Sequence, residues 1–374
     1  MTVRPVSQPS VDLEDAALRI ESWLLDSGVQ LSAGAHRGGV AGWLDVRGGA
    51  EFVYLEITGY YLTMLAGLAE VSPGSGARGA LARERGWAAL RWMRAVTVNG
   101  AVPHTRVYLS HERDDWRNRA TFSFDLAMAA RGVGCFGEVV GAGETATLLH
   151  DLCDRLAETC AGSVPLASHV LRDGPGGYLP DRWSTRPGPH HVKAAAAILR
   201  LPVDVVDPAL ADACRKTVGY WATTMQSTWP CDELHPLLYG VEGLLVLAPA
   251  MGAQMLDAAE AIYERLLRLQ AADGSLPAMR GASTGVRSDV LAQALRAGAL
   301  LRAAGRLRDD GWESRLDALA ALLVRHVRCD GAVLFAADQG LANAWCAMFA
   351  HQALLLHARA AEAALSSRGT RLLV

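Results

Sequence analysis

The loop Asp273-Gly-Ser-Leu-Pro277 has three relatives elsewhere in the chain, and this repetition decides the fold. The relatives are Asn99-Gly-Ala-Val-Pro103, Gly176-Gly-Tyr-Leu-Pro180 and the weaker Asp330-Gly-Ala-Val-Leu334; Gly38-Gly-Val-Ala-Gly-Trp-Leu-Asp45 is a looser version. Six times along the chain, an amphipathic segment precedes a more apolar one with polar residues near its start, and five of the six connections are glycine-rich. Such a repeat predicts six helical hairpins closed in a ring, which is an all-α (α/α)6 toroid.

The two kinds of segment predict outer and inner helices. The amphipathic segments are the expected outer helices, at 12–27, 78–97, 144–161, 207–225, 253–271 and 311–327. The more apolar segments are the expected inner helices, at 52–70, 121–133, 189–200, 235–250, 286–304 and 343–360. Glycine and proline mark the junctions, and no linker is long enough to divide domains. We therefore predict one domain over residues 1–374, with flexible ends at 1–10 and 365–374.

The composition argues against nucleic acid and membrane partners. The 374 residues carry a net charge of −3, and without a basic patch a polynucleotide partner is not expected. The first ten residues lack the apolar core of a signal peptide, and the longest apolar runs, such as 244–251, are too short to cross a bilayer. Seven cysteines without a framework spacing indicate reduced thiols. We expect a cytoplasmic protein.

Polar residues near the starts of the inner helices are expected to point into one shared funnel. From these we predict Glu56, Asp125, Asp289 and His235 as catalytic residues. The predicted substrate-binding residues are Tyr60, His104, Arg106, Trp183, His191, Arg287, Asn343 and Trp345. Carboxylate, imidazole, guanidinium and indole groups from distant segments suit a polar small-molecule substrate, because Trp stacks on sugar rings and Arg binds carboxylates.

Each of the main candidates also has a purely structural interpretation. Glu56 lies in the apolar stretch 52–60, where a buried charge needs either a partner or a function. The structural alternatives for the others are an ion pair for Asp125, a helix-dipole contact for Asp289, a helix cap for His235, and solvation for His104 and Arg106.

Two cyclase-like patterns are present only in fragments. Cys231 and His235, with Cys346 and His351, are similar to the zinc ligands of lanthipeptide cyclases, but Cys329 is followed by Asp330 instead of His. We therefore predict no metal and no cofactor. Residues 269–275 are similar to the Gln-and-Gly repeat of terpene cyclases, but the Asp-x-Asp-Asp acid motif is absent and aromatic residues make up only 6 % of the chain.

One group of proteins matches several short segments. Tyr54-Leu-Glu-Ile-Thr-Gly-Tyr60 resembles the Tyr-Pro-Glu-Ile-Thr-Gly-Tyr motif of bacterial (α/α)6-toroid proteins encoded near polysaccharide or secondary-metabolite genes. Asp273–Pro277 is similar to their Asp-Gly-x-Phe-Pro loop, Asn343–Phe349 to their Asn-Trp-Ala-x-Lys-Phe-Phe segment, and Phe124-Asp125 to the start of their Phe-Asp-Thr-Gly-Gln segment. Leu55 replaces the proline, and Leu126-Ala-Met128 replaces Thr-Gly-Gln. The resemblance implies a toroid like those of six-hairpin glycosidases, lyases and epimerases, and a carbohydrate-type substrate.

These observations favour an enzyme of biosynthetic tailoring that acts on a sugar-like or other polar metabolite. Glu56 and Asp125 are the expected general acid and base, with Asp289 as the alternate, in a hydrolase. In a lyase or epimerase, His235 or Tyr60 takes a proton next to a carboxylate that Arg106 or Arg287 holds.

Two other hypotheses make different predictions about the funnel. A natural-product cyclase predicts an apolar funnel with one lone carboxylate, whereas paired carboxylates beside an exposed Trp favour a sugar. A non-catalytic binding toroid predicts that all funnel carboxylates are held in salt bridges, without perturbed pKa values.

Overall fold

The structure is a computed structural model that describes residues 12–71, 76–97, 101–160, 162, 164–172, 178–282, 285–308, 310–359 and 373. The loop positions Asn99, Gly100, Gly176 and Gly177 lie outside these residues, as do both predicted flexible ends except Leu373.

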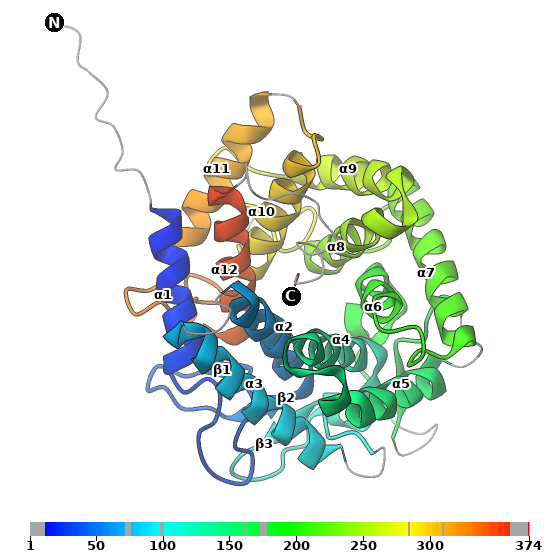
Figure 1. The fold of residues 1–374 in the computed structure, drawn as a ribbon. Helices are drawn as coiled ribbons and strands as arrows, with labels where there is room; N and C mark the ends of the chain where they lie inside the picture. The colour runs from blue at the N-terminus through cyan, green and yellow to red at the C-terminus, as the bar shows by residue number, and fades with distance from the viewer. Residues whose placement is uncertain are drawn as a thin grey trace, which may run out of the picture.

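Twelve α-helices in the described residues alternate between an outer and an inner ring (Figure 1). The outer helices are α1 (Leu13–Asp26), α3 (Ala77–Val96), α5 (Ala146–Cys160), α7 (Pro208–Ser227), α9 (Ala253–Leu267) and α11 (Asp310–Val324). The inner helices are α2 (Leu55–Val71), α4 (Ser123–Val140), α6 (His190–Leu199), α8 (Leu234–Met251), α10 (Ser288–Ala303) and α12 (Ala344–Ala358). Each inner helix packs on the next, and α12 closes the ring on α2. The (α/α)6 toroid prediction is confirmed.

Burial explains the two sequence patterns. Outer helices such as α5 and α9 bury one face only, which requires an amphipathic sequence. Inner helices are covered on all sides, so every residue from Leu234 to Ala248 is buried in α8. Among the described helices, α8 is also long and apolar enough to cross a membrane, but 83 % of it is buried inside the protein. The expectation that every apolar segment is too short was wrong for α8, because a fully covered core helix is as apolar as a membrane span.

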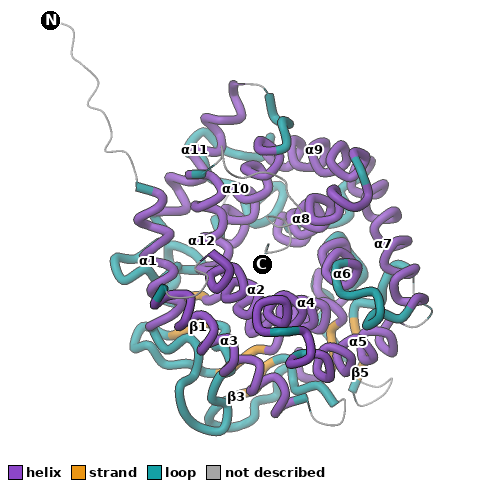
Figure 2. The backbone as a smooth tube through the Cα atoms, in the orientation of Figure 1, coloured by secondary structure: helices purple, strands orange, loops and turns teal. Residues whose placement is uncertain are grey.

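Three short two-stranded ribbons replace parts of the predicted helices. β2 (Phe52–Tyr54) pairs with β3 (Arg106–Tyr108), β4 (Ala120–Phe122) with β5 (His169–Leu171), and β1 (Trp43–Leu44) with β6 (Ala342–Asn343), all antiparallel. The helices predicted to begin at 52, 121 and 343 therefore begin at Leu55, Ser123 and Ala344, respectively. Aromatic and β-branched residues favour these strands. In Figure 2 the strands lie in the lower part of the view, near α3 and α5.

The inner helices α2 and α4 touch through their backbones. A Cβ on Gly132 would lie 2.1 Å from the carbonyl oxygen of Gly59, and one on Gly59 would lie 2.5 Å from that of Met128. The prediction that α4 ends at 133 was wrong, because Gly132 is a packing contact inside a helix that runs to Val140. The contact lies one to two turns beyond Glu56 and Asp125, so it brings the starts of both helices together.

Replacing Gly132 with Ala is expected to destabilise the protein by about 1–3 kcal/mol, because the added methyl group forces α2 and α4 apart. The matched control is Gly219→Ala on α7, where a Cβ meets nothing within 4 Å. That variant is expected to gain up to about 1 kcal/mol from helix propensity. Urea unfolding measures both changes, and equal stability of the two variants would contradict the close α2–α4 contact.

Candidate active site

A cavity of about 350 Å³ lies at the ends of the inner helices where their N-termini meet. Every inner helix contributes to its wall at or just before its first turns, through Glu56, Asp125, His190, His235, Arg287 and Trp345. The remaining lining residues are Tyr54, Ile57, Thr105, Arg106, Trp116, Arg117, Phe122, Phe124, Arg182, Trp183, Ser184 and Tyr239. The long connections from outer to inner helices form the rim, and the ribbon residues Tyr54, Arg106 and Phe122 hold parts of it in register.

Glu56 and Asp125 form a pair of carboxyl groups in this wall. Glu56 is only 8 % exposed, and burial raises its pKa to about 7 although Lys193 and hydrogen bonds from Tyr54 and Tyr60 lower it. Burial and the neighbouring Glu56 charge raise the pKa of Asp125 well above its ordinary range. Neither carboxyl group forms an ion pair with a described residue. Since two close carboxylates resist simultaneous ionisation, each carboxyl group favours a proton on the other.

Asp115 fixes two arginines beside this pair. Its Oδ2 accepts hydrogen bonds from Arg106 Nη1 at 3.2 Å and from the Tyr108 hydroxyl at 3.0 Å. Its Oδ1 accepts from the backbone N–H and Nη1 of Arg117, both at 3.0 Å. The Arg106 guanidinium also lies 4.4 Å from the centre of the Phe52 ring. Both arginines therefore present positive charge to the cavity from fixed positions.

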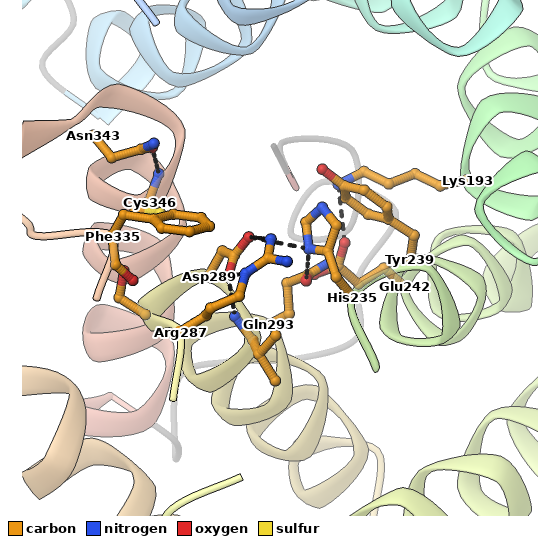
Figure 3. A network of polar contacts seen from close by, with 12 residues as sticks. Lys193, His235, Tyr239, Glu242, Arg287, Asp289, Gln293, Phe335, Asn343 and Cys346 are labelled. Carbon is orange, nitrogen blue, oxygen red and sulfur yellow. Dashed lines mark hydrogen bonds and ion pairs between the residues drawn. The ribbon is translucent and has the colours of Figure 1, made fainter. Parts of the chain in front are cut away.

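On the opposite side, His235 is held by Gln293 and Asp289 (Figure 3). Nδ1 of His235 lies 2.6 Å from Oε1 of Gln293 and 3.4 Å from Oδ2 of Asp289. Since an amide oxygen only accepts hydrogen bonds, Nδ1 carries the proton and Nε2 keeps a lone pair. Burial lowers the pKa of His235 to about 4, so the imidazole is neutral at pH 7.

Asp289 serves the cavity through its neighbours. It is fully buried and does not line the cavity, and the Arg287 guanidinium donates to both of its carboxylate oxygens. Burial opposes ionisation, yet Arg287 and His235 hold the pKa of Asp289 below its ordinary value. The predicted catalytic role for Asp289 does not fit this placement. Its ionised carboxylate accepts hydrogen bonds from Arg287 on both oxygens and lies outside the cavity. It therefore orients Arg287 and His235 and does not exchange protons with a substrate.

Aromatic rings line part of the cavity. The Trp183 ring lies 5.0 Å from His190 and 5.5 Å from His235 in edge-to-face contacts. Phe124 lies 4.9 Å from Tyr239 on the same side. Such flat, partly apolar faces beside polar groups suit the alternating apolar and hydroxyl faces of a sugar ring.

Seven of the predicted site residues line the cavity together: Glu56, Asp125, His235, Arg106, Trp183, Arg287 and Trp345. Five do not: Asp289, Tyr60, His104, His191 and Asn343. His104 is a half-exposed loop residue 3.5 Å from Glu112. His191 is buried, with its Nδ1 accepting a hydrogen bond from the backbone N–H of Gly188. Asn343 caps α12 by accepting from the Cys346 N–H at 2.9 Å, and Tyr60 lies beneath the cavity.

The sequence reasoning missed several lining residues. Arg117 and Trp116 come from a short 3₁₀ helix inside the α3–α4 connection, and Thr105 directly precedes β3. No repeat or helix-start pattern marks these positions, because a ribbon and a short turn bring them to the rim. His190 and Tyr239 lie in the first turns of inner helices, where polar side chains are expected to point into the funnel, and both line the cavity.

The cysteine and histidine pattern of the zinc hypothesis is dispersed. Cys346 is fully buried inside α12, and His235 bonds Gln293 instead of a cysteine neighbour. In the described part of the chain, no three His, Cys, Asp or Glu side chains gather in a group able to hold a metal ion.

Comparison with known proteins gives a likeness in fold and no closer relative. No family model matches the sequence, and no curated protein matches it. Among solved structures, cellobiose 2-epimerase from Spirochaeta thermophila superimposes with a TM-score of 0.68 at 15 % identity, over 95 % of this chain and 99 % of that one.

An unsaturated glucuronyl hydrolase specific for heparin has a TM-score of 0.68 at 9 % identity, over 95 % of this chain and 99 % of that one. The type II terpene cyclase MstE from Scytonema has a TM-score of 0.58 at 15 % identity, over 94 % of this chain and 99 % of that one. At these identities the likeness concerns the fold, and it shows that this chain is an (α/α)6 toroid built like those of sugar epimerases and hydrolases.

Proposed function

We propose that the protein is an enzyme that transfers protons on a sugar or sugar-like polar metabolite, with Glu56 and Asp125 as its acid and base. The observation that carries this proposal is the pair itself. Two carboxyl groups from neighbouring inner helices face one cavity, form no ion pair with described residues, and have raised pKa values. Such carboxyl groups exchange protons near neutral pH, as general acid and base catalysis requires.

The rest of the cavity supports a small polar substrate. Its volume of about 350 Å³ lies at the lower end of the range of ligand pockets, and suits one or two sugar units. Arg106, Arg117, Arg182 and Arg287 line it, and the positive ends of the inner-helix dipoles point toward it. These charges favour a substrate with an acidic group, such as a uronate.

Hydrolysis of a glycosidic bond is the reaction that such a pair performs best. One carboxyl group donates a proton to the leaving oxygen while the other takes a proton from the attacking water. Trp183 offers a flat face for the sugar, and Arg106 holds polar groups of the substrate beside the pair.

Epimerisation or isomerisation is the second candidate, and His235 is the observation that favours it. The imidazole is neutral, its Nδ1 proton is held by Gln293, and Asp289 lies 3.4 Å from the same nitrogen. Nε2 would take a proton from the carbon next to a carbonyl group, while a protonated carboxyl group of the pair polarises that carbonyl.

The other two hypotheses fit the cavity less well. A cyclase acting on an apolar polyene needs an apolar chamber, whereas this cavity contains four arginines and two carboxyl groups. A binding toroid predicts funnel carboxylates held in salt bridges, which Glu56 and Asp125 do not form with described residues. Biosynthetic tailoring of a metabolite in the cytoplasm remains our proposal for the cellular role.

Isotope labelling separates the two reactions. A panel of disaccharides, uronates and free hexoses is incubated with the protein in H₂¹⁸O and, separately, in D₂O. Hydrolysis is expected to place ¹⁸O on the released sugar, with Glu56→Gln and Asp125→Asn each losing roughly 10²–10⁴-fold in rate. Isomerisation is expected to place deuterium on carbon, with His235→Gln the most damaging change.

Two controls accompany these variants. His104→Gln matches His235→Gln, and Glu264→Gln on α9 matches Glu56→Gln; neither position lines the cavity. Turnover that survives in Glu56→Gln, Asp125→Asn and His235→Gln alike would refute the proposed function.

A further inference from the structure

A second group of charges lies in the centre of the inner ring, beneath the cavity. Lys193 of α6 is 2 % exposed, and Glu242 of α8 and Arg296 of α10 are fully buried. None of the three lines the cavity. Lys193 Nζ lies 2.9 Å from Oε2 of Glu242, and Arg296 Nε lies 2.9 Å from its Oε1. Since each buried charge is costly to desolvate, two cations around one carboxylate call for a reason beyond stability.

Helix packing fixes the position of the Lys193 ammonium group. A Cβ on Gly243 would lie 2.6 Å from the backbone nitrogen of Lys193, so α6 and α8 are in backbone contact at this level. The ammonium group lies 4.4 Å from the centre of the Tyr239 ring and 5.1 Å from those of Tyr60 and Phe349. Aromatic rings surround it on several sides, so its charge is weakly screened.

Two tyrosines connect this group of charges to Glu56. The Tyr60 and Tyr239 hydroxyl oxygens lie 3.1 Å apart, within hydrogen-bond distance, and Tyr239 lines the cavity (Figure 3 shows Tyr239 beside Lys193 and Glu242). Tyr60 follows Glu56 by one turn of α2 and is also a hydrogen-bond partner of its carboxyl group. The charge of Lys193 lowers the pKa of Glu56, in opposition to burial.

Asp125 lacks comparable support. The Thr105 hydroxyl donates to its carboxyl group at 3.4 Å, near the limit of such bonds. The Glu56 charge disfavours the ionisation of Asp125, and Arg117 and Arg172 oppose this effect only in part. The two carboxyl groups therefore stand in unequal surroundings, with the cation and the tyrosine hydroxyls on the side of Glu56.

We infer that Lys193 is a positioning residue that makes Glu56 the ionised member of the pair and leaves the proton on Asp125. The inference rests on the proposed function, and it assigns Glu56 as the general base and Asp125 as the general acid. In hydrolysis, Glu56 takes a proton from water as the water oxygen bonds to carbon. Asp125 gives its proton to the leaving oxygen as the carbon–oxygen bond breaks. Glu56 then loses its proton to solvent and Asp125 regains one, so water is the only reagent consumed.

The groups that face Lys193 come from every inner helix. They are Tyr60 of α2, Arg131 of α4, Tyr239 and Glu242 of α8, Arg296 of α10, and Phe349 of α12. Burial lowers the pKa of Lys193 to about 7, with Glu242 raising it and Arg296 and Arg131 lowering it further. The ammonium form and the Glu56 carboxylate thus stabilise each other, and losing either disfavours the other.

The test compares Lys193→Met with Lys193→Arg, since the first removes the charge and the second retains it. The acidic limb of the kcat/KM profile is expected to move upward by about one pH unit in Lys193→Met and to stay in place in Lys193→Arg. KM above the limb is expected to stay unchanged, because Lys193 does not touch the cavity. A limb that does not move in Lys193→Met overturns the inference.

A second variant and a second readout keep the test decisive. Tyr60→Phe removes a hydrogen bond to Glu56 with little change in volume, and is expected to move the limb in the same direction by less. Without a substrate, ¹³C-carboxyl NMR of labelled glutamate, with Glu56→Gln to assign the signal, follows the titration of Glu56 directly. If Glu56→Gln and Asp125→Asn retain activity, the proposed function fails. If both lose activity but Glu56 titrates at the same pH in Lys193→Met as in the wild type, only this inference fails.

Discussion

Glu56→Gln is expected to be more stable than the wild type above pH 7 while it loses most of its activity. Burial raises the pKa of Glu56 to about 7, whereas the unfolded chain titrates near 4.5. A glutamine keeps the shape of the side chain and avoids burying a charge. A shift of this size corresponds to a gain of about 3 kcal/mol as an upper limit. Activity falls because the amide cannot exchange a proton with water or substrate.

The stability difference between Glu56→Gln and the wild type depends on pH. Because the folded pKa is raised, the stability linked to protonated Glu56 is fully present below pH 4.5 and is lost as the pH rises through 7. Glu56→Gln and the wild type should therefore unfold at the same urea concentration at pH 4 and diverge between pH 5 and 8. Glu264→Gln on the outer helix α9 is the control and should follow the wild type throughout. A Glu56→Gln variant that is less stable than the wild type at pH 8 would contradict the geometry of the pair.

Arg296→Met is expected to destabilise the protein by about 3–5 kcal/mol, the largest loss among the variants considered. Arg296 is fully buried and donates to Glu242 and, through Nη1, to Oε1 of Gln352 at 2.8 Å. Its removal takes away the hydrogen bonds that Arg296 donates to Glu242 and to the Gln352 amide oxygen. Urea unfolding at pH 7 measures the change.

A surface ion pair supplies the control for Arg296→Met. Lys216 and Asp212 pair on the exposed face of α7, at 2.7 Å and with both side chains more than half exposed. Lys216→Met is expected to change the free energy of unfolding by less than about 1 kcal/mol. Similar losses in the two variants would show that the central charges contribute no more than a solvated pair does.

The sequence predicted the helices better than it predicted the loops. The alternation of amphipathic and apolar segments gives all twelve described helices, because helix amphipathicity depends on local sequence and on which faces are covered. The strand Phe52–Tyr54 was assigned to a helix, since its partner Arg106–Tyr108 lies far away in sequence and only tertiary contact reveals the pairing. The predicted end of α4 was wrong for a similar reason, because Gly132 meets Gly59 of another hairpin.

The same division applies to the site. Helix-start residues such as Glu56 and His235 were found because their place in the repeat implies their direction. Arg117 was missed because its position depends on Asp115 and a short turn within a long connection. Asp289 and Asn343 were placed at correct helix starts, yet one is held by Arg287 and the other caps α12. The position of a residue in the repeat predicts the direction in which its side chain points. Its hydrogen-bond partners decide whether that side chain is free to contact a substrate.

The ribbons make the rim of the cavity unequal on its two sides. The strand pairs β1–β6, β2–β3 and β4–β5 connect the loops of the sixth, first, second and third hairpins in turn. Within the described residues, the loops of the fourth and fifth hairpins meet at the isolated bridge of Glu233 with Met279, which two backbone hydrogen bonds flank, and through the Arg280–Asp232 ion pair. Glu56 and Asp125 lie on the side where strand pairs join the loops, and His235 and Arg287 lie on the other side. The β-ribbons beside Glu56 and Asp125 thus hold the surrounding loops in one register, so the two carboxyl groups keep one spacing.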